Sequence, residues 1–263
     1  MNIIVLIKQV PNTAEVKIDP KTGNLIREGV ESIINPDDMH AIEASVRLKE
    51  QYGGSVTAIS MGPPQAIDAI SEAMAMGIDR GVLLTDRAFA GADTWATSTA
   101  LGRAIQKLGN YDLVIAGRQA IDGDTAQIGP QVAEYLGIPH VSYVCGIEEV
   151  REGSIIVKRL TYEGLDWVSL PLPGLITVTS QLNTPGFINV GRLLDACKEK
   201  APIYIWNVAD LGLKVHDVGL MGSLTQVIKT FSPKSKRELK LFSGNLESQV
   251  EELLSQLRLK KVI

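Results

Sequence analysis

Short runs of consecutive apolar residues alternate along the chain with longer segments in which apolar residues recur every three or four positions. The runs lie at 3–7, 55–60, 82–84, 113–116 and 140–144. Continuous runs of this length predict buried strands of a parallel sheet. The intervening segments predict helices over about 36–52, 65–76, 94–108 and 130–136. This alternation predicts an α/β protein with a doubly wound, mostly parallel sheet.

Two of the helices begin with clear signals. Asn35 is a good N-cap, Pro36 suits the first helical position, and Asp37 and Asp38 place acids in the first turn. Asp93 is the predicted cap of the helix over 94–108. Before the first helix, 16–18 and 25–27 predict the two strands of a hairpin around a turn-rich stretch at 19–24.

The pattern changes after residue 146. Alternating segments at 147–150, 154–162, 165–170 and 175–179 predict a β-meander that flanks the sheet. A loop at 183–189 and a short helix at 190–200 follow. Residues 201–242 show weak periodicity and are expected to form an arm that embraces another chain, and 246–259 predict a last amphipathic helix. We therefore expect an α/β domain over 1–200 and an arm with a helix over 201–263.

The stretch from Leu113 to Pro130 combines a buried strand, a loop of small and polar residues and a helix start. Free N–H groups at a helix N-terminus favour a phosphate, and ligands of open α/β sheets bind beyond the carboxyl ends of strands. No Walker or dinucleotide fingerprint is present. The alternative is an ordinary glycine-rich turn in which Asp122 and Asp124 are caps or solvated residues, and the pattern alone leaves both interpretations open.

Composition narrows the function classes. The net charge of −4 argues against a nucleic-acid groove, and no apolar run of about 18 residues predicts a membrane span. The N-terminal segment lacks a basic region and predicts a first strand rather than a signal peptide. Cys145 and Cys197 lie far apart, so we expect free thiols in a cytoplasmic protein.

The sequence contains no arrangement typical of a catalytic side chain. It has no nucleophile elbow and no metal-ligand spacing, and His40, His140 and His216 are scattered. We therefore expect no catalytic residue and no metal site. If the protein carries out redox chemistry, a bound cofactor must supply it.

Four motifs occur in the order typical of one family. They are the run from Val5 to Val10, Asn35-Pro36-Asp37-Asp38 with the helix after it, Ser60-Met61-Gly62-Pro63 with the downstream 75–81, and the run from Gly117 to Asp122. Together they resemble the beta subunit of electron-transfer flavoproteins over essentially the whole chain. The resemblance implies a Rossmann-like, adenine-nucleotide-binding fold and a heterodimer with an alpha subunit.

The family divides at the nucleotide loop. Housekeeping members have an acidic loop and hold AMP as a structural ligand. Here residues 122–130 read Asp-Gly-Asp-Thr-Ala-Gln-Ile-Gly-Pro, which resembles the electron-bifurcating members, whose beta subunit holds FAD. Gly123 and Ala126 leave room for a second phosphate, and Thr125 and Gln127 add donors. Asp122 and Asp124 would repel a phosphate, so we expect them to point away from it.

The bifurcating resemblance implies that NADH is the electron donor. One electron would pass to ferredoxin or flavodoxin, and the other, through an FAD of the alpha subunit, to an acyl-CoA or 2-hydroxy-acid dehydrogenase. The alternatives are a non-bifurcating carrier with structural AMP and, less favoured, an adenine-nucleotide hydrolase, whose Ser-Gly-Gly-x-Asp-Ser loop is missing.

The resemblance also implies two sets of site residues. The expected cofactor-binding set is Leu6, Ile7, Lys8, Asn35, Pro36, Asp37, Asp38, Met61, Gly62, Ala116, Gly117, Arg118, Gln119, Ala120, Asp122, Gly123, Asp124, Thr125, Ala126, Gln127 and Ile128. The expected docking set for the dehydrogenase is Pro185, Gly186, Phe187, Val190, Leu193 and Leu194.

Overall fold

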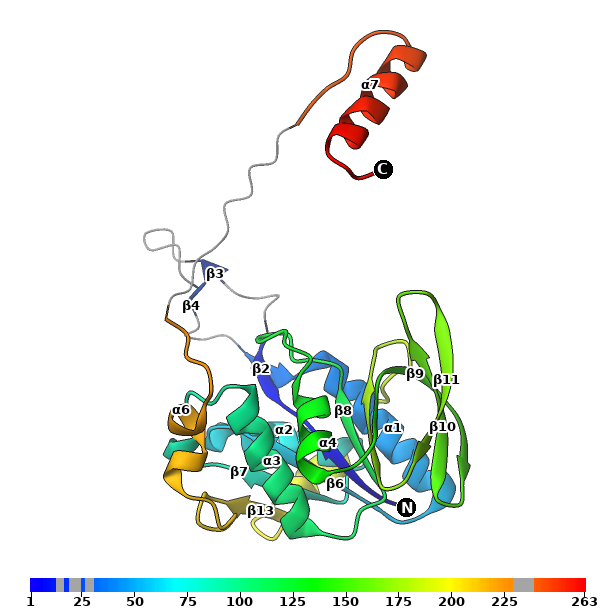
Figure 1. Ribbon diagram of the computed structural model, residues 1–263. Helices are drawn as coiled ribbons and strands as arrows, with labels where there is room; N and C mark the ends of the chain where they lie inside the picture. The colour runs from blue at the N-terminus through cyan, green and yellow to red at the C-terminus, as the bar shows by residue number, and fades with distance from the viewer. Residues whose placement is uncertain (13–16, 19–24, 27–30, 229–238) are drawn as a thin grey trace. The chain divides into compact units, whose positions relative to one another are not determined.

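A nine-stranded sheet forms the centre of the protein in a computed structural model that describes residues 1–12, 17–18, 25–26, 31–228 and 239–263. The strand order is β11-β10-β9-β12-β8-β1-β6-β7-β13 (Figure 1). The pairs from β9 to β13 are parallel, and β10 pairs antiparallel with both β9 and β11. The predicted doubly wound, mostly parallel sheet is confirmed. Its strands are β1 (Asn2–Leu6), β6 (Ser55–Met61), β7 (Arg80–Leu84), β8 (Leu113–Gly117), β9 (His140–Arg151), β10 (Ser154–Leu160), β11 (Leu165–Pro171), β12 (Gly174–Val178) and β13 (Ile203–Trp206).

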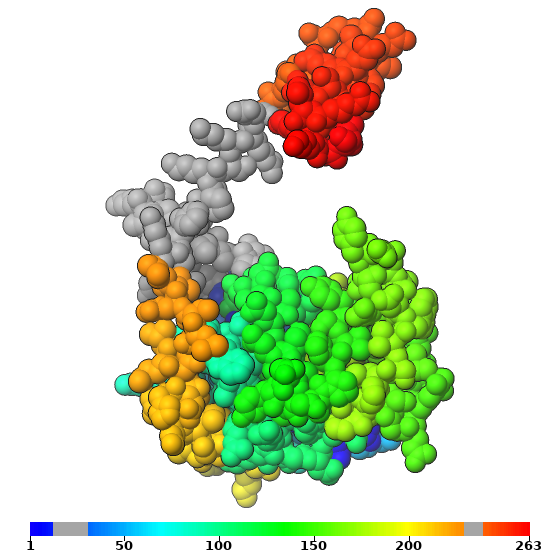
Figure 2. Space-filling model, in the orientation of Figure 1, coloured from blue at the N-terminus to red at the C-terminus, as the bar shows by residue number. Residues whose placement is uncertain are grey.

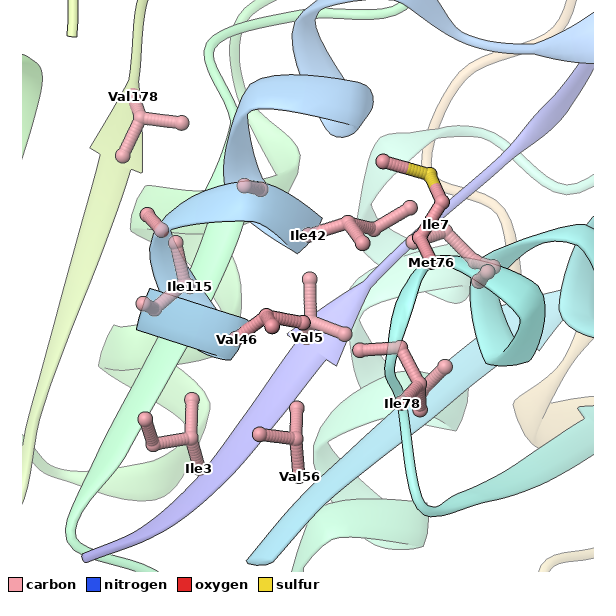
Figure 3. Packing of buried hydrophobic residues seen from close by; sticks show 14 of the residues in the cluster. Ile3, Val5, Ile7, Ile42, Val46, Val56, Met76, Ile78, Ile115 and Val178 are labelled. Carbon is pink, nitrogen blue, oxygen red and sulfur yellow. The ribbon is translucent and has the colours of Figure 1, made fainter. Parts of the chain in front are cut away.

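Helices cover both faces of this sheet and bury two separate apolar clusters. On one face Ile3 and Val5 of β1 pack with residues of α1, α2 and α5 (Figure 3). On the other face Ile4 and Leu6 pack with residues of α3 and α4. Successive residues of a strand point to opposite faces, so a strand buried on both sides must be apolar throughout. These helices are α1 (Pro36–Tyr52), α2 (Ile67–Met76), α3 (Thr94–Leu108), α4 (Ile128–Leu136) and α5 (Val190–Ala196).

Two small ribbons and several short helices complete the elements. β2 (Gln9–Pro11) pairs antiparallel with β5 (Ser32–Ile34), and β3 (Lys17–Ile18) pairs antiparallel with β4 (Leu25–Ile26). The β3–β4 pair agrees with the predicted hairpin, whose other residues lie outside the described part of the chain. The short helices are the 3-10 helices η2 (Pro64–Ala66), η3 (Arg87–Phe89) and η4 (Val215–Asp217), and α6 (Gly219–Gly222).

The meander differs from its prediction in two respects. The segments expected at 140–144 and 147–150 form one long strand, β9, in which Tyr143 has a φ of 62° and the register shifts. The segment expected at 175–179 as the last meander strand is instead β12, which lies between β8 and β9 and is parallel to both. All five β12 residues are buried, which is typical of a central parallel strand rather than a flanking one.

Two helix boundaries also differ. α4 begins at Ile128 rather than at Pro130. Proline remains compatible with this position because the first four N–H groups of a helix have no partner within it. α5 ends at Ala196 rather than at Lys200.

Residues 201–226 belong to the main compact unit, which spans Met1–Gln226 rather than 1–200. β13 pairs with β7, and Val208, Leu211 and Val218 are buried against the α3 face of the sheet. The Thr225 N–H donates to the Asp93 carboxylate at the start of α3 (2.9 Å). Figure 2 shows the yellow-to-orange surface of this segment beside the cyan and green surface of residues near 90–110. The apolar positions here are too sparse for a periodic pattern, which is why the sequence predicts only an arm.

A second unit comprises Val227–Ile263. It contains the predicted last helix, α7 (Leu246–Leu259), whose N-cap Asn245 accepts a hydrogen bond from the Ser248 N–H at 2.9 Å. Within this unit Leu246, Val250 and Leu253 are exposed. The packing of α7 on an alpha subunit therefore stays a prediction.

Candidate functional site

The direction of winding reverses between β1 and β8. From β1 the chain continues to β6 and β7 on one side, and β8 and β12 then extend the sheet on the other side. The crevice at the carboxyl ends of the strands flanking such a reversal is where open α/β sheets bind ligands. The loop after β8, residues 118–127, and the start of α1 both lie at this end, where β1 leads into β2 (Figure 1).

Gly117 allows the end of β8 to approach the first turn of α1 very closely. A Cβ atom at this position would overlap the Asp38 carboxylate and would lie 2.8 Å from the Asp37 carbonyl carbon. Any larger residue would therefore push α1 away from the strand. Gly117, one of the expected cofactor-binding residues, therefore also sets the distance between the elements that surround the site.

Asn35 ties three segments together. Its backbone N–H donates to the Lys8 carbonyl (2.9 Å), and its side-chain Nδ2 donates to the Gln119 carbonyl (2.9 Å). Its Oδ1 accepts from the Ile121 N–H at 3.0 Å. Asn35 occupies the predicted N-cap position, but its side chain makes no capping hydrogen bond to α1.

Asp38 lies in the first turn of α1 beside Gly117 and is 6% exposed. Burial is the main cause that raises the pKa of its carboxyl group, to about 7. Hydrogen bonds from Asn35 and from the Lys8 N–H (2.8 Å) oppose the rise, and the neighbouring charge of Asp37 adds to it. The carboxyl group is therefore close to half-protonated at neutral pH.

The other three carboxylates of the site all have cationic or amide partners. The Lys8 ammonium lies 2.7 Å from Asp122, and Arg118 Nε lies 3.2 Å from an Asp37 oxygen. The Gln119 side-chain amide donates to the Asp124 carboxylate. These pairings reduce the repulsion that four acids would exert on an anionic ligand.

The loop itself presents unpaired backbone donors. Among the residues that the structure describes, no acceptor is present for the N–H groups of residues 125–129. Asp124 and Ala126 both have a φ of 53°, in the left-handed region, and the Asp124 N–H donates to the Ala120 carbonyl at 2.8 Å. Successive amides in such a turn form a concave anion-binding surface. Because a Cβ atom added at Gly123 would meet nothing within 4 Å, this surface is open on that side.

The far end of the loop is fixed to α3 and β12. Thr94 Oγ1 donates to Gln127 Oε1 at 2.9 Å, and a Cβ atom at Gly129 would overlap the Thr177 side chain. Thr94 was not among the residues expected from the sequence. In the sequence, Thr94 stands out only by its position directly after the helix cap Asp93. Its contact with the loop depends on the tertiary fold and could not be read from the sequence.

The end of β6 forms the other side of the crevice. Met61 and Gly62 are half-buried there, and the Gly62 N–H donates to the Leu84 carbonyl at 3.1 Å. Ser60 is fully buried, and its hydroxyl group has no hydrogen-bond partner in the described part of the chain. Ser60 belongs to the motif Ser60-Met61-Gly62-Pro63 but was not among the expected cofactor-binding residues.

The expected cofactor set therefore converges on one end of the sheet, but its members differ in accessibility. Leu6, Ile7 and Ala116 are at most 6% exposed, so these positions offer little more than backbone atoms to a ligand. Five loop residues are exposed together with Lys8 and Pro36, namely Asp122, Gly123, Asp124, Thr125 and Gln127.

The expected docking segment is bonded to α1 and α2. The Glu43 carboxylate accepts from the Gly186 N–H at 2.9 Å, and the Asn189 N–H donates to the Ala75 carbonyl at 3.1 Å. Phe187 is fully exposed and Val190 is 68% exposed, while Pro185 and Leu193 are half-buried. An exposed apolar surface on an anchored loop is suited to protein contact. Docking of the dehydrogenase on this segment stays a prediction.

The described ranges contain no group of three or more His, Cys, Asp or Glu residues arranged to hold a metal ion. None of the helices described is long and apolar enough to cross a membrane.

Comparison with known proteins identifies close relatives. The model of the electron transfer flavoprotein domain family matches residues 22–211. The chain is 49% identical, over the full length of both proteins, to an electron transfer flavoprotein subunit beta of Thermoanaerobacterium thermosaccharolyticum. It is 48% identical to subunit CarD of the caffeyl-CoA reductase-Etf complex of Acetobacterium woodii and 41% identical to the acryloyl-CoA reductase electron transfer subunit gamma of Anaerotignum propionicum, again over the full lengths.

Proposed function

Because this chain belongs to the electron transfer flavoprotein family as a beta subunit, which works with an alpha subunit, we propose that it is the FAD-binding beta subunit of an electron-bifurcating complex. The bound FAD would accept electrons from NADH and deliver them to ferredoxin or flavodoxin and, through the alpha-subunit FAD, to a dehydrogenase. Two relatives carry the names of acyl-CoA reductase complexes, which favours an acyl-CoA partner over a 2-hydroxy-acid partner.

The observation that carries the proposal is the loop over 122–129. Its unpaired N–H groups, the space beside Gly123 and the neutralised acids suit a ligand with two phosphates. An AMP carrier needs only one phosphate position, and the housekeeping loop would place a further acid near it. The chain's own residues would bind and orient the diphosphate through the amides of 125–128, and Thr125 and Gln127 would add side-chain donors.

The proposal predicts direct reduction by NADH. The chain is co-expressed with its alpha subunit, purified without oxygen and mixed with NADH, and the flavin absorbance is followed. We expect NADH to bleach the flavin, and ferredoxin to be reduced only when the dehydrogenase and its oxidised substrate are present. A heterodimer whose flavin is reduced by the dehydrogenase and its substrate but not by NADH would instead be the non-bifurcating carrier.

A further inference from the structure

Asn35 was expected to contact the ribose or flavin, but its side chain is fully buried and already paired. It is 0% exposed, and both ends of its amide bond the backbone of the loop after β8, at Gln119 and Ile121. Its own N–H holds the end of β1 through Lys8. A ligand in the crevice therefore cannot reach this side chain without breaking the bonds that shape the loop.

We infer that Asn35 is a positioning residue that keeps the loop over 119–129 shaped for the nucleotide before the nucleotide binds. This inference rests on the proposed nucleotide function. Asn35 acts at the start of the loop, where it fixes the peptide groups on either side of Ala120. The Asp124 N–H bonds the Ala120 carbonyl, so the unpaired amides that follow are held relative to the same anchor.

The position of Asn35 supports this role. A residue that precedes a helix usually turns its side chain onto the first N–H groups of that helix. Asn35 makes no such bond. Its backbone carbonyl accepts from the Asp38 N–H at 2.9 Å and from the Met39 N–H at 3.3 Å, and its side chain also bonds the Asp38 carboxyl group. Instead of capping the helix, the side chain bonds the backbone of residues 84 and 86 positions away in sequence.

An amide side chain can make both bonds at once, because its donor and its acceptor are separate atoms. It donates to the Gln119 carbonyl and accepts from the Ile121 N–H, whereas a carboxylate can only accept and would add charge beside the buried Asp38. Alanine would leave both backbone groups without a partner in a buried place. The loop would then sample other conformations, and binding would have to select the competent one.

The test compares Asn35→Ala with Asn183→Ala in the full heterodimer. Asn183 is a matched control because it also ties a loop to α1, through Nδ2 to the His40 carbonyl at 2.9 Å, but its side chain bonds His40 and not the loop over 119–129. Each protein is stripped of nucleotide and titrated with FAD. We expect Asn35→Ala to raise the FAD dissociation constant by roughly tenfold or more, and Asn183→Ala to leave it at the wild-type value.

A second measurement needs no variant. In the stripped wild-type protein, hydrogen exchange should be slower at the Ile121 amide than at the amides of residues 125–127. Equal exchange, or equal FAD dissociation constants for Asn35→Ala and wild type, would overturn the inference. If the isolated heterodimer holds AMP and no FAD in this chain, the proposed function fails, and the same titration with AMP still decides the role of Asn35.

Discussion

At the scale of single residues, the site places four carboxyl groups near the proposed position of an anionic ligand. Lys8, Arg118 and Gln119 each engage one carboxylate, and Asp38 is buried beneath them. Asp122 and Asp37 are thus paired with cations, whereas the exposed Asp124 is held by a neutral amide. Amides that have no acceptor then supply the attraction for phosphate.

Gly123→Asp tests where the phosphates lie. Nothing is within 4 Å of a Cβ atom at this position, so the fold should tolerate the change and the melting temperature should stay near that of the wild type. The new carboxylate would occupy and charge the diphosphate path, so the beta-subunit flavin should be lost. Gly123→Ala is the control and should keep its flavin. Wild-type flavin content in Gly123→Asp would place the phosphates elsewhere.

Asp38 should make stability depend on pH. Its pKa of about 7 in the folded protein exceeds the ordinary value of 3.8, so the folded chain binds more protons than the unfolded chain between these values. The Asp38 contribution to stability is therefore greatest below pH 4 and is lost as pH rises to about 7.

Asp38→Asn removes this titration while its Oδ1 can still accept from the Lys8 N–H. Relative to wild type, the variant should gain stability between pH 5 and pH 8, by an amount on the order of a few kcal/mol. Urea denaturation at several pH values measures the difference. A difference that does not change over this range would show that Asp38 is already ionised in the folded protein.

At the scale of elements, continuous apolar runs and helix caps were enough to predict the central strands and the starts of α1 and α3. The Asp93 carboxylate accepts from the Ala96 N–H at 3.0 Å, as its position predicts. The insertion of β12 between β8 and β9 was not predictable, because it depends on pairing between segments distant in sequence. The tie from Asn35 to the loop was missed for the same reason, although the loop itself was located from its glycines and its helix start.

The docking segment yields a prediction at this scale. Val190 begins α5 and is 68% exposed. Val190→Asp should weaken dehydrogenase binding by about 2–5 kcal/mol if this contact is a hot spot, measured by calorimetry on the heterodimer. Tyr162→Asp is a control at a fully exposed position in the turn between β10 and β11. Equal affinity for Val190→Asp and wild type would remove the segment from the interface.

At the scale of the whole molecule, the nucleotide crevice and the expected docking segment use different parts of one rigid scaffold. The crevice lies at the carboxyl ends of β1, β6 and β8, while the docking segment lies on α1 and α2. We therefore expect substitutions in the docking segment and in the proposed nucleotide site to act separately on dehydrogenase docking and on nucleotide binding. Residues 201–226 complete the sheet, so the part of the chain left for an arm is shorter than the sequence suggested.

The most direct test of the account is a count of the nucleotides released from freshly isolated heterodimer. Acid extraction followed by reverse-phase chromatography separates FAD from AMP. We predict two FAD and no AMP per heterodimer, because the amides ahead of Pro130 would hold a diphosphate. One FAD and one AMP per heterodimer would contradict it.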